Sequence, residues 1–185
     1  MNRRERWSWG LNTVGGAAML VGAIDPLEGS LLILPGSGCM ALGTWLGSGA
    51  RRYARFRLLV FILIALGVGA LWSMSFFGGV GGTSGHSVWW SLLTVPYFVG
   101  WPMGILGRDS PRWLTYAGMV VGAWYVAMPL MMLARAAQHR PPTLVPVMLV
   151  GALGLVTIAG GIARLRPARA PTAPTPGEEE MAGDK

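Results

Sequence analysis

The sequence predicts an all-α integral membrane protein, a bundle of six transmembrane helices with both termini in the cytoplasm. Two observations predict this fold class: six long apolar stretches fill most of the chain, and nearly all arginines lie in alternate breaks between them. Each stretch has about 17–22 residues, close to the roughly 20 residues at 1.5 Å each that cross a hydrocarbon core. The expected spans lie near 8–24, 26–47, 57–77, 88–107, 113–134 and 143–163.

The arginines orient the predicted bundle. Twelve of the fourteen lie before the first span, around the second and fourth breaks, or after the sixth span, and only Arg135 and Arg140 lie in the other breaks. This positive-inside bias places both termini in the cytoplasm. It also accounts for the net charge of +7, so we expect no nucleic-acid partner. The excess of Arg, Gly and Ala is typical of GC-rich bacterial genomes and predicts a multi-pass protein of the bacterial cytoplasmic (inner) membrane.

Composition predicts a single domain. Hydrophobic residues make up 52% of the chain and charged residues 12%, against about 25% charged in soluble domains. The spans leave only short loops, so residues 1–166 form one transmembrane domain without room for a soluble catalytic domain. Residues 167–185 are rich in Pro and Ala and then acidic, which predicts a disordered cytoplasmic tail.

Small residues recur at helical spacing within the predicted spans. Lipid gives helices no hydrophobic reason to associate, so stripes of small residues that permit close backbone approach favour packing. We expect most of them to hold the bundle together, with self-association or another membrane protein as the alternative use. The stripes are Gly15/Ala18/Gly22, Gly43/Gly47, Ala65/Gly69/Ser73, Gly100/Gly104 and Gly118/Gly122.

Two short polar segments have the pattern of helix starts. Asp25 suits the N-cap of the second span, with a proline after it and Glu28 at the third helical position, as in a capping box. Ser110 is expected to cap the fifth span in the same way, because Pro111 follows it.

Apart from Glu28 in the first turn of the second span, the predicted spans contain no Asp, Glu, Lys or His. Proton- or ion-coupled transporters usually keep an ionisable residue at depth, so this absence argues against that class and against intramembrane proteases. The outer face gathers Asp25, Glu28, His86 and His139 as candidate metal ligands. No pair of them has a diagnostic spacing and the helix cap already accounts for both acids, so we expect neither a metal nor a cofactor.

The least ordinary region is the glycine-rich break at 78–87 together with the fourth span, which prolines at 96 and 102 interrupt. Broken helices line binding sites in many carriers, because the freed backbone groups need partners. A kinked span below an adaptable loop predicts an outward-facing pocket. Its candidate residues are Gly81, Gly82, Ser84, His86, Tyr97 and Trp101.

Short loops, uncharged spans and the lack of a catalytic constellation favour a small non-enzymatic membrane protein. We expect an accessory or assembly-type subunit that acts in the lipid bilayer through helix packing. The alternative is a channel or facilitator for a small neutral or apolar solute, with its site near the glycine-rich loop and the kinked fourth span.

Overall fold

A computed structural model describes residues 2–25, 28–47, 51–78, 88–107, 109–136 and 144–166. Over these ranges the chain is helical and has no strand, which confirms the all-α fold class. Each predicted span corresponds to a helix, and the predicted tail at 167–185 lies outside the described residues. The elements are α1 (Arg3–Gly22), α2 (Ser30–Leu46), α3 (Arg51–Phe76), the 3-10 helix η2 (Val88–Thr94), α4 (Val95–Leu106), α5 (Arg112–Ala136) and α6 (Leu144–Leu165).

Three helices are long and apolar enough to cross a membrane, over Tyr53–Phe76, Arg112–Met131 and Met148–Leu165. The others fall short for separate reasons. Helix α2 has 17 residues, and α1 begins with four consecutive charged residues. Helix α4 has only 12 residues because the chain before it is 3-10, with a proline in the first turn of the α-helix. The six spans expected from the sequence are thus confirmed as helices, and three of them as candidate spans.

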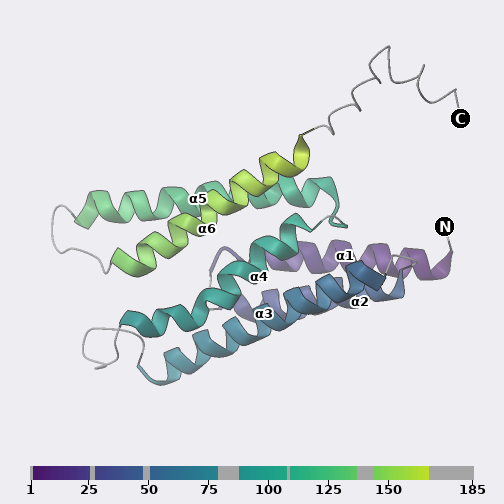
Figure 1. Ribbon diagram of the computed structural model, residues 1–185, viewed down its shortest axis with the longest axis horizontal. Coiled ribbons are helices and arrows are strands. Elements are labelled where there is room, and N and C mark those ends of the chain that lie inside the picture. Colours follow the sequence, from purple (N-terminus) through teal and green to yellow (C-terminus); the bar gives the residue numbers. More distant parts are fainter. Residues whose placement is uncertain are drawn as a thin grey trace, which may run out of the picture.

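The helices pack as two antiparallel pairs with α4 between them (Figure 1). Helices α1 and α2 form one pair, with α3 against α2, and α5 and α6 form the other. Helix α4 contacts α3, α5 and α6, and also reaches α1. The start of α1 and the end of α6, both of which carry arginines, are at the same end of the bundle (Figure 1).

The core surrounds α4. Trp101 and Ile105 are buried there with Met19 of α1 and Ile64 of α3. Gly67 shows how closely these helices approach, because a Cβ at this position would overlap the backbone nitrogen of Tyr97. Glycine is required here by the approach of α4.

The small-residue stripes divide into packed and open ones. Those of α1, α2, α4 and α5 lie against a neighbouring helix: a Cβ on Gly15 would overlap the carbonyl oxygen of Gly36, and one on Gly118 would overlap Ile105. On α3, by contrast, no described atom from outside the local stretch of helix lies within 4 Å of the Cβ position of Gly69. Ser73, one turn later, is also exposed.

The two predicted caps fare differently. The Asp25 carboxylate accepts a hydrogen bond from the backbone N–H of Glu28 at 3.2 Å, as an N-cap does. Helix α2 nevertheless begins at Ser30, with Gly29 as its N-cap, so Asp25 caps a turn that precedes the helix. The expectation for Ser110 is wrong: α5 begins at Arg112, and the Ser110 hydroxyl instead donates to the carbonyl oxygen of Gly104 on α4.

Candidate functional site

A buried arginine organises one end of the bundle. Arg57 is 1% exposed although it lies on the second turn of α3. Its Nε donates to Asp109 Oδ2 at 2.7 Å, and its two terminal nitrogens donate to the Gly104 carbonyl oxygen and the Ser110 hydroxyl, each at 2.6 Å. Since charge-assisted bonds of this length are strong ones, Arg57 binds α3 to the end of α4 and to the link before α5.

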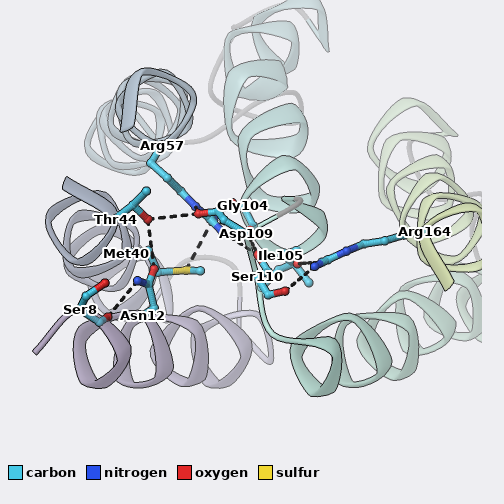
Figure 2. Close-up of polar contacts among 10 residues, drawn as sticks. All are labelled: Ser8, Asn12, Met40, Thr44, Arg57, Gly104, Ile105, Asp109, Ser110 and Arg164. Carbon is cyan, nitrogen blue, oxygen red and sulfur yellow. Dashed lines mark hydrogen bonds and ion pairs between the residues drawn. The ribbon is translucent and has the colours of Figure 1, made fainter. Parts of the chain in front are cut away.

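Asp109 extends this network towards α1 and α2 (Figure 2). The Thr44 hydroxyl of α2 lies 3.1 Å from Asp109 Oδ2 and 3.3 Å from Asn12 Oδ1 of α1. A hydroxyl has one hydrogen to donate, so Thr44 serves one of these oxygens at a time. The Asn12 amide in turn donates to the Ser8 carbonyl oxygen at 2.9 Å.

A second arginine approaches the same link from the other side. The Arg164 guanidinium, near the end of α6, donates to the Thr115 hydroxyl at 2.7 Å and to the Ser110 carbonyl oxygen. It also reaches the Ile105 carbonyl oxygen at 3.5 Å. Ser110 therefore lies between Arg57 and Arg164 (Figure 2). With Thr115 of α5, the network joins the six described α-helices through side chains or the α4–α5 link.

An open cleft of about 340 Å³ adjoins the network. Its walls carry hydroxyl groups, a carboxamide, two carboxylates and two aromatic rings. Asp109 forms part of the wall, and its second oxygen, Oδ1, is buried without a hydrogen-bond partner. Only Oδ2 is thus engaged, by Arg57 and Thr44. The residues are Glu5, Ser8, Trp9, Asn12, Thr13, Thr44, Gly47, Tyr53, Asp109 and Pro111.

The Arg57–Asp109 ion pair and its hydrogen bonds hold the helices together at this end of the bundle, and we call this arrangement the interhelical lock. The charged groups of Arg57 and Asp109 are bonded to each other and to neighbouring helices, and neither is an unengaged acid or base. Removing two charges from water is costly unless they are paired and further hydrogen-bonded, and both conditions hold for this pair.

Four of the predicted pocket residues, Gly81, Gly82, Ser84 and His86, lie outside the described residues. The other two are in the interior: Tyr97 is 2% exposed and Trp101 1%. The Trp101 indole donates to the Met19 carbonyl oxygen at 3.0 Å, whereas the Tyr97 hydroxyl has no hydrogen-bond partner among the described residues. The outward-facing pocket stays a prediction that depends on residues 79–87.

The predicted metal ligands are not gathered within the described residues. No group of three or more His, Cys, Asp and Glu side chains lies together there. Asp25 and Glu28 share the turn before α2, and His86 and His139 are outside the described ranges.

In the sequence, Arg57 is one of the arginines that orient the bundle, and Asp109 lies in the hydrophilic break before the fifth span. This interpretation did not predict that the two residues pair. A signal was present in the spacing. Arg57 precedes Val60, Ile64 and Val68 by three, seven and eleven residues, which places it on the same helical face as these three buried side chains. An arginine on that face needs a partner, and Asp109 is the acid that the adjacent link supplies.

Comparison with known proteins returns no match: no protein family, curated protein or solved structure is detectably similar to this chain.

Proposed function

We propose that this chain is a six-span protein of the bacterial cytoplasmic membrane, with both termini inside, and that it is a non-enzymatic accessory or assembly subunit. Three helices have the length and apolarity of membrane spans, and the other apolar helices lie beside them in one bundle. Large apolar side chains such as Val120, Leu155 and Leu66 are exposed on α5, α6 and α3. Exposure of this extent suits lipid rather than water.

The interior favours a packing role over transport. A solute path would have to pass the region around α4, where Tyr97, Trp101 and Ile105 fill the space between helices. The polar cleft lies at one end, beside the Arg57–Asp109 pair. Two apolar hollows open on the flanks, one between α3, α4 and α6 and one between α2 and α3.

The open face of α3 is the observation that carries the proposal. Ala65, Gly69 and Ser73 follow one another at helical spacing, and the position of a Cβ on Gly69 is free of neighbours. The stripes on α1, α2, α4 and α5 are used inside the bundle, so the stripe on α3 is available to a helix from another chain. Close approach at such residues is how helices associate in lipid. We infer that α3 packs against a transmembrane helix of a partner membrane protein or of a second copy.

Replacement of Gly69 by leucine tests this role. A Cβ at this position meets no described neighbour within 4 Å, so the protein should insert and fold normally. Affinity purification in mild detergent, followed by mass spectrometry, should then recover wild-type protein with a partner or a second copy, and Gly69→Leu without it. Gly10→Leu is the matched control, because Gly10 on α1 also has no neighbour within 4 Å of its Cβ position. Equal recovery of the partner with both variants, or a monomeric wild type without partner protein, would contradict the proposal.

A further inference from the structure

A second surface feature, a groove between α2 and α3, has a composition that points to a particular ligand. Its volume is about 460 Å³. The walls are almost entirely apolar along its length, formed by Gly38, Ala41 and Leu42 of α2 and by Leu58 and Phe61 of α3. A Cβ on Gly38 would lie 3.3 Å from the Phe61 ring. The glycine therefore allows α2 and α3 to approach closely at this end of the groove.

One end of the groove is different. Trp45, 71% exposed, and Arg55, also exposed, both lie in its wall where α2 ends and α3 begins. Within the described part of the chain the Arg55 guanidinium joins no ion pair and donates no hydrogen bond, in contrast to Arg57 two residues later. From Trp45 to Gly38 the groove follows α2 for seven residues, about 10 Å along the helix axis.

We propose that this groove binds one membrane phospholipid of the cytoplasmic leaflet, with its phosphate at Arg55 and one acyl chain along Leu42, Leu58 and Phe61. A guanidinium matches the charge and geometry of a phosphate, and an indole suits the level of the headgroups. Basic pockets between helices on the cytoplasmic side are typical sites for anionic lipids. A transmembrane helix from another protein would fill the apolar length of the groove but would leave the guanidinium of Arg55 without a negatively charged partner.

This inference rests on the membrane placement proposed above and not on the partner helix at Gly69. Native mass spectrometry of the full chain in a non-ionic detergent, titrated with dioleoylphosphatidylglycerol, measures the lipid affinity. We expect one tightly bound lipid for wild type and an affinity about fivefold weaker for Arg55→Gln, the effect of one arginine at a membrane surface. Ala41→Phe should block the groove and abolish the tight site, and Leu58→Ala, a milder change on the α3 wall, should weaken it. Arg112→Gln, on another exposed arginine at the same end, should leave the affinity unchanged.

Three outcomes would overturn the proposal. Equal weakening by Arg55→Gln and Arg112→Gln would indicate diffuse surface charge. Displacement of the lipid by millimolar inorganic phosphate would indicate a site for a free anion. Loss of a dimer rather than of a lipid in Ala41→Phe would indicate a protein helix. The two proposals can fail separately. If Gly69→Leu has no effect on association while the groove still binds one lipid, the partner role is wrong and the lipid site stands.

Discussion

Arg57 Nε lies 2.7 Å from Asp109 Oδ2, and this ion pair joins residues 52 positions apart in the sequence. Around it, the Thr44 hydroxyl donates to Asp109 Oδ2, and the Gly104 carbonyl oxygen and the Ser110 hydroxyl accept from Arg57. The pair therefore fixes how the α1–α3 half of the bundle meets the link between α4 and α5.

Removal of one member of this pair should destabilise the protein strongly. Arg57→Leu leaves the Asp109 carboxylate without its cation, which costs about 3–5 kcal/mol for a buried pair. The double variant Arg57→Leu with Asp109→Leu should lose less than the sum of the two single variants, because no charge is left unpaired. Thermal and denaturant unfolding in detergent measure the three differences. Arg55→Leu, an exposed change two residues earlier, should stay within about 0.5 kcal/mol of wild type; a loss as large as that of Arg57→Leu would refute the lock.

Gly67 and Gly69 form a matched pair on α3. Gly67→Ala should destabilise the protein by about 1–3 kcal/mol, because its Cβ would force α4 away at Tyr97. Gly69→Ala should be neutral or stabilising by up to about 1 kcal/mol, since alanine favours the helix and meets no neighbour. Unfolding midpoints of the two variants give the comparison directly. If both alanines had the same effect, the close contact of α3 and α4 at Gly67 would be disproved.

Tyr97 and Tyr125 differ in whether their hydroxyls are bonded. The Tyr125 hydroxyl donates to the Ala23 carbonyl oxygen, so Tyr125→Phe should cost about 0.5–1.5 kcal/mol. Tyr97→Phe removes a buried hydroxyl that has no partner and should cost nothing or stabilise. Unfolding measurements on the two variants separate these cases. A cost for Tyr97→Phe equal to that for Tyr125→Phe would show that a group outside the described residues bonds this hydroxyl.

The turn before α2 can be tested at Asp25. Asp25→Ala should cost about 0.5–2 kcal/mol by loss of the hydrogen bond to the Glu28 N–H, whereas Asp25→Asn should cost little because asparagine also caps well. Thermal unfolding of both variants measures the difference. If asparagine proves as damaging as alanine in a protein that still folds, the negative charge has a role besides capping.

Cysteine labelling in whole cells tests the six-span topology. In a Cys39→Ala background, Glu28→Cys and Ser84→Cys should react with a membrane-impermeant maleimide, whereas Tyr53→Cys and Thr175→Cys should react only after permeabilisation. Position 28 is preferable to 29, where a Cβ would overlap the Gly22 carbonyl oxygen. Labelling of position 175 but not 84 in intact cells would show that the orientation is reversed or that the number of spans is not six.

The pattern of apolar residues was enough to locate each α-helix of the described residues, and the predicted bounds differ from the observed ones by a few residues at most ends. The largest differences are at the starts of α1, α2 and α3, and the first two have local causes. Helix α1 extends back to Arg3 because Asn2 and Glu5 form a capping box outside the apolar stretch. Helix α2 starts late because Asp25 closes a separate turn first. The apolar residues thus predict where a helix lies, whereas its first residue depends on local polar contacts that are harder to predict.

By itself the sequence determined the all-α class, the number and position of the helices and the grouping of arginines in alternate breaks, because periodicity and charge are local properties of the chain. Tertiary structure decided which stripe of small residues stays open, since packing uses those of α1, α2, α4 and α5 and leaves Gly69 free. It also decided that Arg57 is buried against Asp109 whereas Arg55 faces outward. Two residues of the same type, two positions apart, acquire different roles because a helix turns about 200° between them, and only the packed neighbours show which side is the interior.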